Sequence, residues 1–536
     1  MLTFFRDVSA PAPSLLDNTA DIDRLLRALA EGPYADAELP MEIPYRRLGL
    51  LAARFRAAGF RGTAVLNHRG SRLEVVDFLP RRPDTLPGLA LDLGTTFLEA
   101  TLLDLLQGRV LARGRTRNRQ EDLGADILSR IHHAGRPNDT AASPSPAAGL
   151  GTMQHLVRES IDELAAALAT EAGIEVGDIR ALTVAGNTTM MHLLLGLNPY
   201  HLCREPYIPL VCAPDLCAAA ELGLALHPEA PVWCFPGVGS YFGGDLVSGV
   251  LACGLDQAEH TRMLIDVGTN AEVVLGNRDW LIACAGAAGP ALEGGVARMG
   301  MRAGPGAIER VRILQPPWRL ECQTIGGGAA RGLCGSGLID LVAELFLARL
   351  IDQRGRLRRP EQVRDPARRQ FLQARLREEG DGLLFRVTEP ANDNDGPAVE
   401  LTQVELDAIM RSKAAMYAIL STITAKVGIG FDELERIEVA GAFGRHIDPR
   451  QAIVLGMLPD LPLSTYRAVG NSALAGAELA LRDDGLRSRA RALAGRITYE
   501  ELNVNQDFML RFSGGRFIPH TDASLFPSVP AGAPPA

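Results

Sequence analysis

Two loops of the sequence place an aspartate at the end of an apolar run, directly before a Gly-Thr pair. Residues 89–103 read LALDLGTTFLEATLL and residues 263–275 read MLIDVGTNAEVVL, so Asp92 and Asp266 occupy the same place in two copies of one pattern. A single Asp-X-Gly turn is also common between the strands of a hairpin. Two copies, each opening what reads as an α/β half, favour a functional repeat over two unrelated turns.

Each copy carries the groups that bind a nucleotide phosphate. Glycine lets the backbone approach an anion, and successive N–H groups of such a turn form a concave nest for phosphate oxygens. Carboxylates repel phosphate, so Asp92 and Asp266 are expected to hold Mg²⁺ through water. Two such loops facing each other across a cleft would clamp the phosphates. The residues expected to cradle them are Gly94, Thr95, Thr96, Gly268, Thr269 and Asn270.

A third segment of the same kind is IEVAGAFGRHI at 437–447, where an apolar strand runs into small residues. Gly441, Ala442 and Gly444 would let an adenosine lie against the backbone. The alternative is a tight strand-to-helix turn with no ligand. The presence of two phosphate loops favours the adenosine interpretation.

Two further strand-to-helix turns could contribute to the site. The segment TVAGNTTMMHLLLG at 183–196 places Asn187 and Thr188 either toward the cleft or as caps of the following helix. Asp245 follows two glycines at the start of another helix. It is a candidate to orient water, or a Mg²⁺-bound water, near a γ-phosphate. Its alternative role is a favourable negative charge at a helix N-terminus.

Composition excludes several functional classes. The chain has 536 residues, of which 47% are apolar and 22% charged, so it can bury at least one large core. A net charge of −9 offers no global attraction to nucleic acid or to an anionic membrane. No apolar stretch approaches the roughly 20 residues of a membrane span. We therefore expect a cytoplasmic protein without a nucleic-acid or membrane partner.

Cysteine and lysine usage narrows the chemistry further. All eight cysteines lie between Cys203 and Cys334 without any CxxC pair, so no iron–sulfur cluster is expected in this chain. Lys413 and Lys426 are its only lysines, which leaves no Walker A lysine and excludes the P-loop class.

The N-terminal part of the chain reads as a small separate module. Residues 1–18 contain prolines without periodicity and are expected to be a loose segment. Residues 19–85 combine two helical patterns with strands at 63–67 and 72–78, which predict a hairpin and hence an α+β module. The proline-containing stretch 79–88 is the best domain boundary.

The remainder reads as one large α/β domain over residues 86–514, because short apolar strands alternate with helices. Its first lobe is expected to start near residue 89 and its second near residue 262. Residues 354–400 are crowded with charges and turn signals, which indicate a surface insertion of helix and loop. Residues 515–536 are predicted to be a disordered Pro/Ala-rich tail.

These motifs together resemble the ATPase superfamily of sugar kinases, Hsp70 chaperones and actin, and within it the reductive activators of corrinoid proteins. The resemblance covers roughly residues 89–482 and implies an α/β, two-lobed actin-like ATPase fold with duplicated ribonuclease-H-like halves. The small module at 19–85 resembles the family's middle domain. The matching segments, in chain order, are LDLGTTFLEATLLD, VAGNTTMMHLLLG, IDVGTNAEVVLG, CAGAAGPALEGGVARMGMRAGPGAI, GLCGSGLIDLVAELF and EVAGAFGRHID.

The resemblance implies an ATP- and Mg²⁺-dependent protein that returns the cobalt of a cobalamin-dependent methyltransferase or corrinoid protein from Co(II) to Co(I). Family members commonly carry an iron–sulfur cluster at one end, whereas here no cysteine precedes Cys203 or follows Cys334. A separate low-potential donor is therefore expected to supply the electrons. The alternatives are a small-molecule kinase, with Asp245 as its base, and a nucleotide-binding regulator without turnover. The sequence leaves homodimerisation open.

Overall fold

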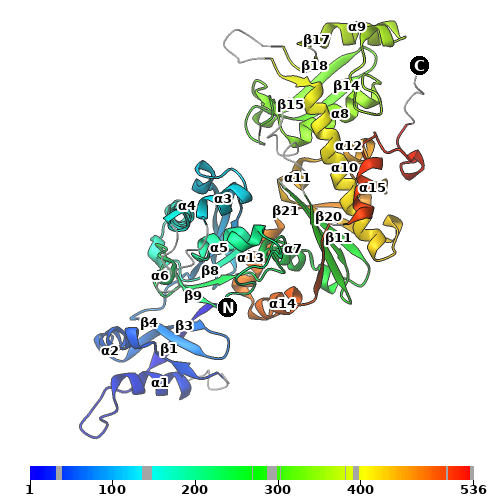
Figure 1. Ribbon diagram of the computed structural model, residues 1–536. Helices are drawn as coiled ribbons and strands as arrows, with labels where there is room; N and C mark the ends of the chain where they lie inside the picture. The colour runs from blue at the N-terminus through cyan, green and yellow to red at the C-terminus, as the bar shows by residue number, and fades with distance from the viewer. Residues whose placement is uncertain are drawn as a thin grey trace. The chain divides into compact units, whose positions relative to one another are not determined.

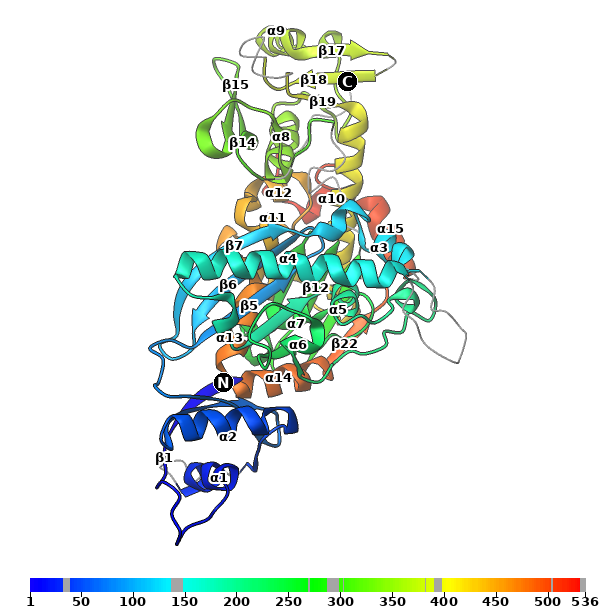
Figure 2. The ribbon, with the colours of Figure 1, turned by 90° about the vertical axis from the view of Figure 1, so that its left-hand side faces the viewer.

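The computed structural model divides into two compact units, which Figures 1 and 2 show from two directions. The first unit comprises Met1–Ala252 with Ala473–Gly495, and the second comprises Cys253–Ser472 with Arg496–Ala536. The residues that the structure describes are 1–31, 39–135, 148–268, 270–286, 298–301, 303–380, 382–389, 398–502 and 505–530.

A small α+β module begins the first unit (Figure 1). Its four strands lie in the order β1-β3-β4-β2, and the predicted hairpin is confirmed as the antiparallel pair β3–β4. Two helices cover one face of this sheet, where Leu25, Leu51 and Phe55 are fully buried against strand residues such as Phe78. The elements are β1 (Thr3–Ser9), α1 (Asp21–Glu31), β2 (Met41–Glu42), α2 (Leu48–Ala57), β3 (Arg61–His68) and β4 (Leu73–Leu79).

The prediction of a loose segment over residues 1–18 is wrong for strand β1. This strand pairs antiparallel with β3 from Thr3 opposite Asn67 to Ser9 opposite Arg61. Its sequence, TFFRDVS, interrupts an apolar run with two charges and shows no clear alternation. The strand is stabilised by backbone hydrogen bonds to a partner far along the chain, which no local pattern reveals.

The second sheet of the first unit has the order β7-β6-β5-β8-β10-β9. Strands β5, β6 and β7 form an antiparallel meander, while β8 runs parallel to β5 and β10 runs parallel to β8. The strands are β5 (Pro87–Leu93), β6 (Phe97–Asp104), β7 (Arg109–Arg117), β8 (Leu182–Gly186), β9 (Cys217–Ala218) and β10 (Pro231–Cys234).

Helices pack on both faces of this sheet. The long helix α4 (Ala148–Ala172) lies across β6 and β7 and buries Ile161, Leu164 and Leu168 on one stripe, as its periodicity predicts (Figure 2). On the other face, the Thr183 hydroxyl of β8 donates to the Ala477 carbonyl at 2.8 Å. The helices of this region are α3 (Ile127–Ala134), α4, α5 (Thr188–Leu194), α6 (Ala219–Leu222), α7 (Gly244–Cys253), α13 (Ser472–Arg482) and α14 (Asp484–Ala494).

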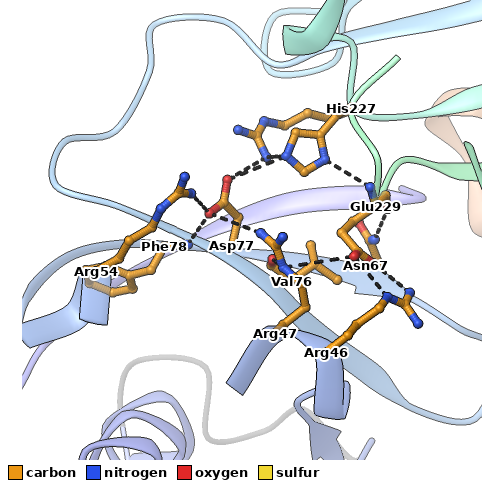
Figure 3. Close-up of polar contacts among 10 residues, drawn as sticks. Arg46, Arg47, Arg54, Asn67, Val76, Asp77, Phe78, His227 and Glu229 are labelled. Carbon is orange, nitrogen blue, oxygen red and sulfur yellow. Dashed lines mark hydrogen bonds and ion pairs between the residues drawn. The ribbon is translucent and has the colours of Figure 1, made fainter. Parts of the chain in front are cut away.

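Polar side chains join the small module to the rest of the first unit (Figure 3). Arg46 of the module makes a two-point ion pair with Glu229, with N–O distances of 3.0 and 2.7 Å, and the Asn67 amide donates to the Glu229 carbonyl at 2.7 Å. The buried carboxylate of Asp77 accepts from Arg180 at 3.1 Å. Ion pairs and hydrogen bonds around two buried carboxylates therefore attach the module to the rest of the unit.

The sheet of the second unit repeats the topology of the first. Its order is β21-β20-β11-β12-β13-β22, so β13-β12-β11-β20-β21 corresponds strand for strand to β7-β6-β5-β8-β10. The senses agree as well, because β11, β12 and β13 are antiparallel and β20 is parallel to β11. The predicted duplication of ribonuclease-H-like halves is confirmed. The strands are β11 (Arg262–Val267), β12 (Ala271–Gly276), β13 (Leu281–Gly286), β20 (Arg436–Ala440), β21 (Tyr466–Gly470) and β22 (Ile497–Glu500).

Two long helices and a second small sheet complete the core of the second unit. Helix α10 buries nearly its whole length, including Met416, Ile419 and Ile423, and packs against β12, β13 and α15. Helix α8 packs on β14 and α12. The elements are β14 (Ala307–Leu314), β15 (Arg319–Thr324), β16 (Gly332–Leu333), α8 (Gly335–Leu347), α10 (Gln403–Lys426), α11 (Gly441–His446), α12 (Pro449–Leu455) and α15 (Gln506–Gly514).

The insertion predicted at 354–400 as helix and loop also contains strands. Helix α9 (Pro366–Arg375) is followed by the antiparallel sheet β17 (Leu376–Glu379), β18 (Gly382–Arg386) and β19 (Glu400–Thr402). Phe385 is fully buried within the main core of the unit. The sequence did not predict these strands, because only a few of their side chains are apolar and face inward while many residues of the region are charged.

The prediction of a disordered tail from residue 515 is wrong for the described residues up to 530. Ile518 and Phe526 are almost completely buried, and the Lys413 amine donates to the carbonyls of Phe517 and Pro519. The proline and alanine content predicted disorder, but the few apolar side chains of this segment pack against α10. Residues 531–536 lie outside the described part of the chain. No helix among the described residues has the length and apolar character to cross a membrane.

Candidate nucleotide site

The first of the two loops predicted to bind phosphate connects β5 to β6 in the first unit. Asp92 lies near the end of β5 opposite Glu99. A side chain at Gly94 would bring its Cβ to 2.4 Å from the Phe97 carbonyl oxygen, so the turn accepts only glycine. The Asn118 side chain donates to the Gly94 carbonyl at 3.0 Å. This loop is therefore fixed by the residue that follows β7 as well as by its own hairpin.

The turn after β8 contacts that loop directly. The Asn187 side-chain oxygen accepts from the Met190 N–H at 2.9 Å and caps α5, while its amide nitrogen donates to the Thr95 hydroxyl at 3.1 Å. The Thr188 hydroxyl donates to the Gly239 carbonyl at 2.6 Å. Of the two roles considered for Asn187, the structure shows the helix cap, and the same side chain also contacts Thr95 of the first aspartate loop.

Asp245 lies in the first turn of α7, beside the same group of residues. Its Oδ1 accepts from the Leu246 N–H at 2.9 Å. A Cβ on Gly243 would lie 2.8 Å from that oxygen and 2.8 Å from the Thr188 nitrogen, so the turn before α7 packs closely on the turn after β8. Burial raises the pKa of the Asp245 carboxyl to about 6. A carboxylate with this pKa can accept or release a proton near neutral pH.

The second phosphate loop connects β11 to β12 in the second unit. Asp266 pairs with Glu272 across this hairpin and with Ala440 on the parallel strand β20, and the Gly268 N–H donates to the Asn270 carbonyl at 2.9 Å. Thr269, a predicted phosphate ligand, lies outside the described residues.

The glycine turn after β20 lies against the second aspartate. Gly441 has a φ of 79°, and a Cβ there would meet the Asp266 Oδ1 at 2.8 Å. A Cβ on Gly444 would lie 2.2 Å from the Val439 carbonyl oxygen, so the start of α11 packs directly on the strand. The side chain of Ala442 lies outside the described residues. The structure thus brings the backbone of the predicted adenosine segment next to a predicted metal-binding carboxylate.

The topology reveals a longer repeat than the two aspartate loops. Val-Ala-Gly ends β8 at residues 184–186 and recurs at residues 439–441. In each unit this tripeptide is on the strand parallel to the one that carries the aspartate. The repetition of the tripeptide was a usable sequence signal for pairing these strands. Asn118 and the buried Arg130, which both contact the first loop, gave no such signal because each is a single polar residue outside any motif.

The cysteines and potential metal ligands give a separate result. All eight cysteines are free thiols, and Cys234, Cys284 and Cys334 are buried. Among the described residues, no three or more His, Cys, Asp or Glu side chains are grouped so that they could hold a metal ion. Taken singly, each aspartate loop offers a carboxylate, the type of oxygen ligand that Mg²⁺ prefers.

Two family models match consecutive regions of the chain, which do not overlap. The model described as the RACo middle region matches residues 87–258, and the model described as the C-terminal domain of RACo, the ASKHA domain, matches residues 260–530. The boundary between them agrees with the start of the second half. The middle region is the first ribonuclease-H-like half, so the assignment of the module at 19–85 to the family's middle domain is wrong.

Curated proteins and a solved structure agree with these matches. The corrinoid activation enzyme RamQ of Eubacterium limosum is 31% identical over 438 residues, which cover 81% of this chain and 71% of RamQ. The [Co(II) methylated amine-specific corrinoid protein] reductase of Methanosarcina barkeri is 23% identical over 72% of this chain and 68% of its own. A solved reductive activator for corrinoid, iron-sulfur protein is 35% identical, with a TM-score of 0.86 over 98% of this chain and 81% of its own. With its duplicated halves and both matched regions, the chain belongs to the RACo family of reductive activators of corrinoid proteins.

Proposed function

We propose that this protein uses ATP to return the cobalt of a corrinoid protein, or of a cobalamin-dependent methyltransferase, from Co(II) to Co(I). Membership of the RACo family carries this proposal. Adding one electron to Co(II) gives Co(I), and the reaction is difficult because ordinary cellular donors are too weak. Nucleotide contacts that favour one of two conformations of the activator would assist the transfer.

The nucleotide is bound through the two aspartate loops. Asp92 and Asp266 hold Mg²⁺ through water, and Asp245 orients a water near the γ-phosphate. The tight glycine turn at Gly94 and the approach of Gly441 to Asp266 support these roles, because both leave backbone rather than side chain at the loops. The loop residues Gly94, Thr95, Thr96, Gly268, Thr269 and Asn270 cradle the phosphates, and Gly441, Ala442 and Gly444 border the nucleotide.

The electron comes from a separate low-potential donor, such as a reductase or a ferredoxin. The support lies in the cysteines, which are irregularly spaced and contain no CxxC pair. Burial raises the pKa of Cys322 to about 11, so this partly buried thiol is protonated at neutral pH and is a poor metal ligand. We place the activator and its partner in the cytoplasm.

The deciding experiment mixes the purified protein with a Co(II) corrinoid protein, Mg·ATP and a low-potential reductant, and follows the visible spectrum. Appearance of the Co(I) spectrum only when both the protein and ATP are present supports the proposal. Reduction at the same rate without ATP, or no Co(I) with any family corrinoid protein, contradicts it. A reaction without the activator measures the background.

A small-molecule kinase is a second candidate because Asp245 offers a carboxylate whose pKa of about 6 suits a general base. ATP turnover that depends on a small hydroxyl acceptor and proceeds without any corrinoid protein would favour it. Turnover that responds only to the corrinoid protein excludes it.

A further inference from the structure

Arg130 is the most deeply buried cation beside the first phosphate loop. It lies on α3, and its side chain has no exposed surface. Its guanidinium donates to the Thr95 carbonyl at 2.5 Å, the Gly124 carbonyl at 2.8 Å, the Gln120 side-chain oxygen at 3.1 Å and the Met190 sulfur at 3.2 Å. Each of these acceptors is neutral.

The ion pairing of Arg130 differs from that of two other buried arginines, Arg24 and Arg487. Within the described residues no carboxylate lies within 4.0 Å of it, whereas Arg24 is paired with Asp17 and Arg487 with Asp484. Burial lowers the pKa of Arg130 to about 10, against the attraction of the more distant Glu121 and Asp126 carboxylates, so the guanidinium stays protonated at neutral pH. A buried charge without a carboxylate in direct contact costs stability. Such a cost is tolerated where it serves binding.

The neighbours of Arg130 connect it to both turns of the site. The side-chain nitrogen of Gln120 donates to the Met153 carbonyl of α4 at 2.8 Å. This hydrogen bond fixes the side-chain oxygen of Gln120, which accepts from Arg130. The Met190 N–H donates to the Asn187 side-chain oxygen that caps α5, and the Asn187 amide nitrogen in turn donates to the Thr95 hydroxyl. Arg130 therefore joins the phosphate loop, the turn after β8 and α4 through one side chain.

The hydrogen bond to Thr95 has a directional consequence. The peptide between Thr95 and Thr96 is planar and trans, so its N–H points opposite to its C=O. The Thr95 carbonyl points toward Arg130, which donates to it. The Thr96 N–H of the same peptide is therefore directed away from Arg130. Donation from a cation to the carbonyl also polarises the peptide and makes its N–H a stronger donor.

We propose that Arg130 is a positioning residue that presets the 93–96 loop through the Thr95 carbonyl, and that the nucleotide phosphates supply the counter-charge of its buried guanidinium. This inference rests on the nucleotide site of the proposed function. A desolvated cation behind the loop attracts phosphate in a region where salt screens little. The same cation has no such electrostatic attraction for the adenosine part of the nucleotide, which is uncharged.

The test compares Arg130→Gln and Arg130→Lys with Arg487→Gln by titration calorimetry with Mg·ATP and with adenosine. Arg487 is the matched control because it is a buried arginine of the same unit whose charge is already paired with Asp484. We expect Arg130→Gln to weaken Mg·ATP binding by about tenfold or more, with a smaller loss in Arg130→Lys. Adenosine binding should be unchanged, and Arg487→Gln should bind Mg·ATP like the wild type.

A second measurement uses inorganic tripolyphosphate and the melting temperature. The anion should stabilise the wild type and Arg487→Gln, and should stabilise Arg130→Gln much less, because ligand binding to the folded state raises its stability. If Arg130→Gln does not fold, the test uses Arg130→Lys. A threefold or larger loss of Mg·ATP affinity, with adenosine affinity unchanged, supports the inference. Wild-type Mg·ATP affinity in Arg130→Lys overturns it.

Three other results overturn the inference. A folded Arg130→Gln variant with wild-type Mg·ATP affinity shows that Arg130 does not act on phosphate. Equal weakening in Arg130→Gln and Arg487→Gln shows a structural role only. Failure of the wild type itself to bind Mg·ATP removes the nucleotide site and the inference together, and so is distinguishable from the first two.

Discussion

The single residue Asp245 combines a position that favours its negative charge with a burial that opposes that charge. It lies at the start of α7, where a negative charge is favourable, and yet burial raises its pKa to about 6. A raised carboxyl pKa means that the folded state favours the protonated form. The contribution to stability is then largest below the unfolded pKa of about 4 and is lost as pH rises through about 6. Ionised Asp245 at neutral pH therefore carries a stability cost.

We predict that Asp245→Asn is at least as stable as the wild type at pH 7.5 but loses ATP turnover by about a hundredfold. The amide keeps the shape of the side chain and removes the charge. Wild-type turnover should fall as pH decreases through about 6, because the carboxyl becomes protonated. Thermal melts and a pH–rate profile measure both effects.

The same variant separates catalysis from binding. Mg·ATP affinity of Asp245→Asn should stay within a few-fold of the wild type, since Asp245 is proposed to orient water. Unchanged turnover together with an unchanged pH profile would remove Asp245 from the chemistry and leave it as a charge at a helix start.

Among the structural elements, the small module is attached to the rest of the first unit through ion pairs and hydrogen bonds to buried carboxylates. Asp77 of β4 is almost completely buried, with Arg180 and Arg54 as ion-pair partners and His227 close by (Figure 3). Burial opposes ionisation of Asp77, but the His227 hydrogen bond and the two arginines outweigh it and hold the carboxyl pKa well below its usual value. The ionised form thus stabilises the fold.

We predict that Asp77→Asn lowers the free energy of unfolding by about 3 kcal/mol, because it leaves buried cations without their partner. The control is Asp7→Asn, whose exposed pair with Arg82 should contribute less than about 1 kcal/mol. The contribution of Asp77 is present above its unfolded pKa of about 4 and is lost as pH falls through the lower folded value. Urea melts at pH 7 and pH 4 should therefore show a smaller difference between Asp77→Asn and wild type at the lower pH.

The C-terminal segment after α15 is a second element whose role depends on burial. Phe526 packs beside Tyr417 of α10 with a centroid distance of 5.3 Å and is almost fully buried. We predict that Phe526→Ala costs about 3 kcal/mol of stability in a thermal melt. Its neighbour Leu525, which is 44% exposed, is the matched control and should cost far less when changed to alanine. Equal, small effects of the two changes would show that the segment contributes little to the fold.

At the scale of the whole molecule, duplication is the dominant feature. Two sheets of the same strand order each place an aspartate at the end of their first strand and a Val-Ala-Gly turn on the next parallel strand. If one Mg·ATP uses both aspartates, their contributions to its affinity must be coupled, whereas two independent sites would give additive effects.

We predict that Asp92→Asn and Asp266→Asn each weaken Mg·ATP binding at least tenfold without unfolding the chain, and that the double variant loses less than the sum of the two free-energy changes. Calorimetry on the wild type, both single variants and the double variant gives the four Mg·ATP affinities of this double-mutant cycle. Strict additivity would argue for two separate nucleotide sites, and unaltered affinity of either single variant would remove that loop.

Three features could be predicted from the sequence alone: the repeated loops, the duplicated α/β fold and the hairpin of the small module. These features follow from short, local patterns, because an aspartate, a glycine and an apolar strand are adjacent in the chain. Asn187 was also visible, since helix caps have a local signature.

The partners of single polar residues and of isolated segments could not be predicted, because they lie far apart in the chain and meet only in the folded protein. Strand β1 owes its existence to backbone bonds with β3, and the C-terminal segment is ordered through Lys413 and the surface of α10. Arg130 reaches the Thr95 carbonyl only because α3 packs beneath the loop. Long-range contacts of this kind depend on how elements pack, and packing is not encoded in the spacing of any one segment.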